Sequence, residues 1–301
     1  MDTTTIKQYE LIRNGGLGFF EQERGLIAVW GKEARQFLDG LISNDVKTLE
    51  DGAEMLAAFP NAQGRLVAVV RVKRAGDRYL FETEGSTLET IFRNLFRFTF
   101  AGDFFVEDLS SQYGFFEFFG SEPSQFLEGG IAYGSGLNPG CFVPSEKLEE
   151  HKTAMLSAGA VEIGPDLYET LRIESGVLKY GVDFDDATIV PELGLEGLIS
   201  YTKGCYIGQE IIARIHFRGH VAKRLTGLVI DTNGSEPFAL SAGIELTAED
   251  GRNAGRITSA TFSPRLGSVI AIAVVRYDHL EPGTTLNAGG FSAKVTALPF
   301  I

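Results

Sequence analysis

Cysteine, histidine and tryptophan are scarce in this chain, and long hydrophobic runs are absent. Its 301 residues include four histidines, one tryptophan and only two cysteines, Cys141 and Cys205. Two cysteines this far apart make neither a disulfide framework nor a CxxC metal motif, which favours a reducing compartment. No apolar run approaches the ~18 residues of a transmembrane helix, and the first residues lack the basic and apolar regions of a signal peptide. These absences predict a soluble, cytoplasmic protein that does not bind membranes.

Positively charged residues are also fewer than negatively charged ones. The chain has 27 lysines and arginines against 40 aspartates and glutamates, a net charge of -13. This charge disfavours direct binding to nucleic acid or to an anionic membrane surface. A hydrophobic fraction of 44% and a mean hydropathy of +0.03 are ordinary for a chain that buries a core. The length predicts about two domains.

The periodicity of apolar residues predicts an α+β region followed by a small β-barrel. In the first part, short strands alternate with amphipathic helices. The predicted strands are 26–30, 53–59, 65–73, 78–83, 104–109 and 114–119, and the predicted helices are 34–41, 87–98, 145–158 with Ser145 as N-cap, and one that begins near Pro165. After Lys223 only short β segments remain, separated by Gly, Pro, Asn and Asp. We therefore predict a boundary near residue 222, with domains 1–222 and 223–301.

The stretch Lys203–Glu210 (KGCYIGQE) is the first candidate for chemistry. Glycines on both sides of Cys205 favour a sharp bend or a close approach of another group. A neighbouring cation such as Lys203 favours the thiolate, which is the nucleophilic and metal-binding form. The alternative is a small apolar cysteine buried in a turn.

A basic stretch follows directly. From Ile211 to Ile230 there is no acidic residue. A strand over 213–220 would place Arg214, His216 and Arg218 on one face, where they could hold an anionic ligand through charge-assisted hydrogen bonds. The alternative is a solvated strand face.

Upstream, Tyr168–Gly176 (YETLRIESG) ends a predicted helix. A buried carboxylate at Glu174 could accept two N–H donors from a heterocycle such as a pterin, and Tyr168 could stack on a flat ligand. The alternatives are a salt bridge between Glu174 and a cation such as Arg172, and a tyrosine that belongs to the core. No spacing of histidines and cysteines favours a metal site.

These motifs resemble the YgfZ family of folate-binding proteins, which is related to the T-protein (aminomethyltransferase) of the glycine cleavage system. The resemblance centres on KGCYIGQE, followed by Ala213-Arg214 and Arg218-Gly219. Three further stretches agree with it: 172–176 (RIESG) with 180–183 (YGVD), 37–46 (FLDGLISNDV), and 64–67 (GRLV).

The resemblance implies folate-binding α+β parts, as two interleaved subdomains around a central channel, and a C-terminal barrel. The implied ligand is tetrahydrofolate or a derivative, with Glu174 on the pterin and Tyr168, Arg172, Gln209, Arg214 and Arg218 as further contacts. Cys205 would be the functional thiol, assisted by Lys203 and able to bind an iron–sulfur cluster transiently. The implied partners are iron–sulfur assembly proteins or client cluster enzymes, including tRNA-thiolating ones.

One departure separates this chain from the transferases. They carry paired aspartates where this chain has Ala68 and Val69, and a folate-dependent one-carbon transfer needs a carboxylate to handle the proton. The leading hypothesis is therefore an accessory protein for iron–sulfur clusters rather than a true aminomethyltransferase. A folate-dependent aminomethyltransferase or demethylase, and a scaffold that has lost its ligand, are the alternatives.

Overall fold

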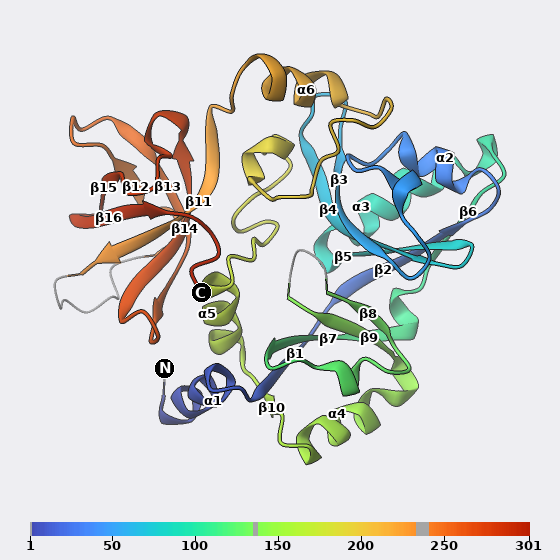
Figure 1. Cartoon of the computed structure of the whole chain (residues 1–301), viewed down its shortest axis with the longest axis horizontal. Helices are drawn as coiled ribbons and strands as arrows, with labels where there is room; N and C mark the ends of the chain where they lie inside the picture. The colour runs from blue at the N-terminus through green and yellow to red at the C-terminus, as the bar shows by residue number, and fades with distance from the viewer. Residues whose placement is uncertain (1, 135–137, 233–240) are drawn as a thin grey trace. The chain divides into compact units, whose positions relative to one another are not determined.

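The computed structural model describes residues 2–134, 138–232 and 241–301 (Figure 1). The chain divides into two compact units. Unit 1 consists of residues 1–167 and 196–210, and unit 2 of residues 168–195 and 211–301. No helix within the described ranges is both long enough and apolar enough to cross a membrane.

Unit 1 contains two five-stranded sheets. The first has the order β3-β4-β5-β2-β6 and is antiparallel throughout. Its strands are β2 (Arg24–Trp30), β3 (Glu54–Pro60), β4 (Leu66–Ala75), β5 (Arg78–Glu84) and β6 (Phe105–Asp108). The second has the order β10-β1-β7-β9-β8, with β1 and β10 parallel. Its strands are β1 (Leu17–Gln22), β7 (Tyr113–Gly120), β8 (Ile131–Tyr133), β9 (Gly140–Pro144) and β10 (Val161–Glu162).

Unit 1 is layered, because successive side chains of a strand point to opposite faces of the sheet and each face packs on a different neighbour. On β2, Ile27 and Val29 face a core that includes Ile91 and Leu95 of α3 (Gly85–Phe96). The intervening Leu26 and Ala28 pack instead with aromatic residues of the second sheet, Phe115, Tyr133 and Phe142. The far face of that sheet packs on α4 (Leu148–Ser157) through Met155. The remaining helices are α1 (Thr3–Arg13) and α2 (Ala34–Asp39).

A buried network of charged groups lies where the two sheets meet. Glu82 of β5 accepts hydrogen bonds from Arg24 of β2 and from Arg71 of β4, the latter over 2.8 Å. Arg71 also donates to the carbonyl of Asn138, whose amide donates to Glu117 of β7. Burial opposes the charge of Glu82, but the two arginines outweigh it and hold the pKa of Glu82 below its ordinary value. The network therefore joins both sheets through one ionised carboxylate.

Unit 2 is built on a closed barrel of the order β11-β14-β13-β12-β15-β16, coloured orange to red in Figure 1. The strands are β11 (Lys223–Asp231), β12 (Glu245–Thr247), β13 (Asn253–Ser263), β14 (Ser268–Arg276), β15 (Thr285–Ala288) and β16 (Phe291–Thr296). Inward-facing aliphatic residues such as Leu228, Ile257 and Val295 fill it. Most of α5 (Pro165–Glu174) and α6 (Gln209–Arg218) belongs to this unit as well.

The predicted α+β class with a terminal barrel is confirmed. The strand predicted over 213–220 is wrong, because residues up to Arg218 belong to α6. Polar residues alternate there, but Ile211, Ile212 and Ile215 follow the helical period and Ile212 is buried. Ser145 is not the N-cap of α4 either: it begins a 3-10 turn, and α4 starts three residues later.

Replacing Glu82 with glutamine should destabilise the protein by about 3–5 kcal/mol, because two buried guanidinium groups lose their charged partner. Urea unfolding followed by circular dichroism measures this. The folded-state pKa of Glu82 is lowered from 4.5, so its contribution is present above that pH and is lost as the pH falls below it. Glu89→Gln is the control, since Glu89 and Arg93 are each 75% exposed, and should cost under about 0.5 kcal/mol. Equal effects would show that the network adds no stability.

Candidate functional site

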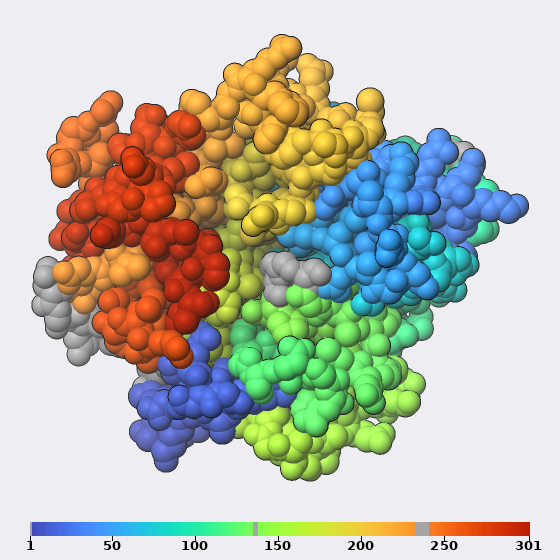
Figure 2. All heavy atoms as spheres, viewed as in Figure 1, coloured from blue at the N-terminus to red at the C-terminus, as the bar shows by residue number. Residues whose placement is uncertain are grey.

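The loop that carries Cys205 is folded onto the N-terminal part of unit 1. In the space-filling view, the yellow segment that contains this loop lies against the blue residues before β4 (Figure 2). The two motifs KGCYIGQE and FLDGLISNDV, far apart in the sequence, are therefore neighbours within one unit.

Lys203 makes the central contact of this neighbourhood. Its side chain is fully buried, and its ammonium group donates to the carbonyls of Asp39, Ile42 and Asn44 over 2.7, 2.9 and 2.8 Å. A carboxylate oxygen of Asp39 lies 3.3 Å from the same nitrogen. Burial lowers the pKa of Lys203, while Asp39 opposes that shift. All three ammonium hydrogens are used by backbone carbonyls, so Lys203 is a positioning residue for the loop.

Shorter side chains complete the attachment. Ser43 donates to the carbonyl of Leu198 over 2.6 Å and accepts from the amide of Ala58 over 2.8 Å. Asn44 bridges the carbonyls of Leu56 and Gly197. Gly208 has a φ of 80°, and a Cβ there would lie 2.4 Å from the carbonyl oxygen of Asn61, so both its conformation and its surroundings require glycine. Sequence reasoning missed Asp39, Ser43 and Asn44 as partners, because their contacts on the loop are mostly backbone atoms.

Cys205 itself is exposed. Within the described residues its thiol has no hydrogen-bond partner, and Gln209 closes the turn behind it by donating to the carbonyl of Gly204 over 3.3 Å. The other cysteine, Cys141, is buried in β9, and burial raises the pKa of its thiol to about 11. Only Cys205 is thus available to a partner in solution.

The helix α6 follows the Cys205 loop directly, and its helical period sets the arrangement of Arg214, His216 and Arg218. Arg214 and Arg218 are four residues apart and share one face of the helix, whereas His216 lies on another. All three side chains are exposed. The helical period therefore separates the trio that a strand would have aligned.

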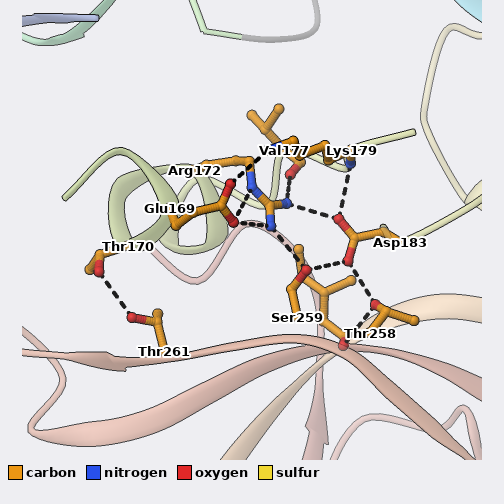
Figure 3. Close-up of polar contacts among 10 residues, drawn as sticks. Glu169, Thr170, Arg172, Val177, Lys179, Asp183, Thr258, Ser259 and Thr261 are labelled. Carbon is orange, nitrogen blue, oxygen red and sulfur yellow. Dashed lines mark hydrogen bonds and ion pairs between the residues drawn. The ribbon is translucent and has the colours of Figure 1, made fainter. Parts of the chain in front are cut away.

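In unit 2, Arg172 of α5 is the centre of a second polar network (Figure 3). It donates to Glu169, to the carbonyl of Val177, to Asp183 over 2.8 Å and to Ser259 over 2.9 Å. All five N–H donors are used. Arg172 is fully buried, so it fixes α5 to the barrel and has no donor left for a ligand.

A β-bulge provides the barrel side of this network. The pairing of β13 with β14 shifts between Ile257 and Ser259, and consequently Thr258 and Ser259 both donate to Asp183, over 2.7 and 2.6 Å. Asp183 also accepts from the amide of Lys179. Its carboxylate is saturated within the protein and available for no metal.

Glu174 ends α5 and is completely buried. Its carboxylate accepts a hydrogen bond from Ser263 of β13, and its carbonyl accepts from the amides of Phe300 and Ile301. Tyr168 is 7% exposed, with the Lys179 ammonium 5.8 Å from its ring centre. Glu174, Tyr168 and Arg172 are therefore brought together on α5 in unit 2, while Lys203, Cys205 and Gln209 belong to unit 1.

Ala68 and Val69, which stand where the resemblance implies the carboxylates of the transferases, both lie on β4. Ala68 of β4 is fully buried in the cluster that contains Phe59, Val70 and Phe81. Val69 alternates to the other face of the strand and is partly buried. Neither side chain can take up a proton.

Lys203→Met should destabilise the protein by about 3–5 kcal/mol, because three buried carbonyls and Asp39 lose their charged partner. Urea unfolding measures the loss, and hydrogen exchange should show residues 197–208 losing protection. Lys47→Met is a matched control: Lys47 also pairs with Asp39, but its side chain is 52% exposed, so the cost should stay under about 1 kcal/mol. If both substitutions cost the same, Lys203 does not hold the loop.

Several known proteins resemble this chain. Residues 223–301 match the glycine cleavage T-protein C-terminal barrel domain. The mitochondrial iron–sulfur cluster assembly factor IBA57 homologue of Mycosarcoma maydis is 29% identical over 240 residues, which span 72% of this chain and 58% of that relative. The aminomethyltransferase of Halothermothrix orenii is 24% identical over 99% of this chain and 92% of its own length. That of Thermosipho melanesiensis is 24% identical over 90% of this chain and 81% of its own.

Among solved structures, aminomethyltransferase T of the glycine cleavage system from Bartonella henselae superposes with a TM-score of 0.85. The match covers 99% of this chain and 89% of that one at 19% identity, which shows a shared fold. Residues 223–301 therefore match the C-terminal barrel domain of glycine cleavage T-proteins, and the chain as a whole shares the fold of an aminomethyltransferase of that system.

Proposed function

We propose that this protein is a cytoplasmic, tetrahydrofolate-binding accessory protein for the assembly or repair of iron–sulfur clusters, with Cys205 as its functional thiol. The observation that carries the proposal is an exposed thiol on a loop that a fully buried lysine fixes in place. Because the loop is already ordered, a partner that binds the Cys205 sulfur does not incur the entropic cost of ordering it.

A thiol is suited to binding an iron–sulfur cluster. Thiolate sulfur is the usual protein ligand of iron in iron–sulfur clusters. One exposed cysteine cannot hold a cluster on its own, since such clusters take four protein ligands. We therefore expect Cys205 to act together with ligands of an assembly protein or client enzyme. The similarity to an iron–sulfur cluster assembly factor supports this class of partner.

The residues on α5 fit a folate in part. The Glu174 carboxylate, which accepts a hydrogen bond from Ser263, would accept the N–H groups of a pterin, and Tyr168 would stack on its ring. Arg172 is fully engaged with its own neighbours and would hold Glu174 and Tyr168 in place through α5. When bound, tetrahydrofolate supplies a carrier for one-carbon units. Gln209, Arg214 and Arg218 remain proposed contacts for its polar end.

A folate-dependent aminomethyltransferase or demethylase is the second candidate, favoured by aminomethyltransferase relatives that align over 90% or more of the chain. The buried methyl group of Ala68 opposes it, because no carboxylate stands at that position to accept a proton. Transfer of a one-carbon unit from a methylamine donor to tetrahydrofolate by the purified protein would establish it.

Cys205→Ser should leave the free energy of unfolding within about 0.5 kcal/mol of wild type, since the thiol is exposed. It should fail to restore the activity of iron–sulfur enzymes in cells that lack this protein. Cys141→Ala is the matched control: it removes a buried sulfur, lowers stability by about 1–2 kcal/mol and should restore activity. Full complementation by Cys205→Ser would refute the role of the thiol.

Glu174→Gln should weaken tetrahydrofolate binding about tenfold or more, because an amide N–H₂ would meet the N–H groups of the pterin. Isothermal titration calorimetry under anaerobic conditions measures this. Cys205→Ser should bind folate as wild type does. Ser263→Ala removes one hydrogen bond to Glu174 but keeps the carboxylate, so it should weaken binding less than Glu174→Gln. Unchanged binding by Glu174→Gln would contradict the pterin role.

A further inference from the structure

Two clefts of unit 2 share part of their lining on the barrel, and the residues that line them do not include Tyr168, Arg172 or Glu174. One has a volume of about 740 Å³ and the other about 300 Å³. Four residues line both: Val182, Lys223, Arg256 and Val274. Two of these four are cations, so the junction of the clefts is basic. Arg276 adds a further cation to the larger cleft and Arg224 to the smaller one.

The strand register concentrates this charge. Lys223, the first residue of β11, lies directly opposite Arg276, the last residue of β14. Arg256 of β13 lies opposite Val274, two residues before Arg276 on the same face of β14. Like charges directly opposite one another on a sheet destabilise it. All three side chains are exposed, and none forms an ion pair within the described part of the chain.

Four carboxylates line the two clefts, and they differ in their surroundings. Asp183 is saturated by Arg172, Thr258 and Ser259. Asp185 accepts hydrogen bonds from the amide of Ala187 and from Thr188, and the buried Glu192 accepts from the amide of Ile189. Only Glu245, opposite Arg256, adds an exposed negative charge to the larger cleft. Four cations and four carboxylates line the two clefts together, and the exposed cations Lys223, Arg256 and Arg276 lie close to one another on β11, β13 and β14.

We propose that Lys223, Arg256 and Arg276 form a binding site for a small phosphorylated ligand with at least two negative charges. Guanidinium groups match phosphate oxygens in a planar fork, and a lysine adds a point charge. An anion between Lys223 and Arg276 also removes the repulsion across that strand pair. This site is independent of the proposed folate and thiol functions.

The size and lining of the clefts favour a small molecule of nucleotide dimensions. Their volumes fall in the usual range for ligand sites, roughly 300–1,000 Å³. Val182, which is 45% exposed, and Val274 offer an apolar surface beside the cations for the non-phosphate part of the ligand. A nucleic acid needs a longer track of cations, whereas here Glu245 lines the larger cleft and Asp185 the smaller one.

Isothermal titration calorimetry of the full chain with pyrophosphate and with ADP tests the site. Wild type should bind both, more weakly as salt rises, and Arg256→Gln or Arg276→Gln should each lower the affinity about tenfold or more. Lys294→Gln, an exposed cation on β16 outside both clefts, is the matched control and should bind as wild type does. Arg276→Gln should also keep or raise the melting temperature, because it removes a like-charge pair; a purely structural arginine would lower it.

Three outcomes overturn the proposal. One is the absence of binding by wild type at low salt, and another is equal binding by the glutamine variants and the control. The third is a preference for a different class of ligand through the same residues: tighter binding of triglutamate, a carboxylate polyanion, or of single-stranded RNA than of ADP.

Discussion

The loop that carries Cys205 in unit 1 depends on a single buried ammonium group, that of Lys203. Removing the Lys203 charge from water costs several kcal/mol, and only well-placed acceptors offset that cost. The carbonyls of Asp39, Ile42 and Asn44 meet this condition. Because these acceptors belong to one turn, the lysine can be satisfied only when the loop and the turn are both formed. The position of Cys205 is consequently set by packing more than 150 residues earlier in the chain.

In unit 2 a buried cation, Arg172, likewise joins separate segments of the chain. The guanidinium group of Arg172 makes all its hydrogen bonds only when α5, the segment 177–183 and the bulge of β13 come together. In both units, a charged residue that was a candidate for the site, Lys203 or Arg172, instead holds neighbouring segments of the chain together. The thiol of Cys205, by contrast, makes no hydrogen bond within the described residues and is exposed.

Much of this architecture follows from local pattern. Alternating apolar residues were sufficient to predict β2 to β5, and turn residues after Lys223 to predict a barrel. The prediction failed at α6, where polar residues with a period of two concealed isoleucines with a helical period. It also gave no indication of what Lys203 and Arg172 touch, since their partners are backbone carbonyls and residues distant in sequence. Side-chain identity reveals that a cation is present; only the fold shows whether its donors are already used.

The same distinction separates fold from activity. A TM-score of 0.85 to an aminomethyltransferase shows a shared backbone arrangement, whereas activity depends on side chains at individual positions such as 68 and 69. Ala68 packs among aliphatic and aromatic residues of the core, where an ionised side chain would carry a large desolvation cost unless a ligand or a cation compensated for it. Alanine at this position avoids that cost and supplies no proton acceptor. The exposed sulfur of Cys205 lies outside that core, on a loop of unit 1 that the buried Lys203 fixes in place.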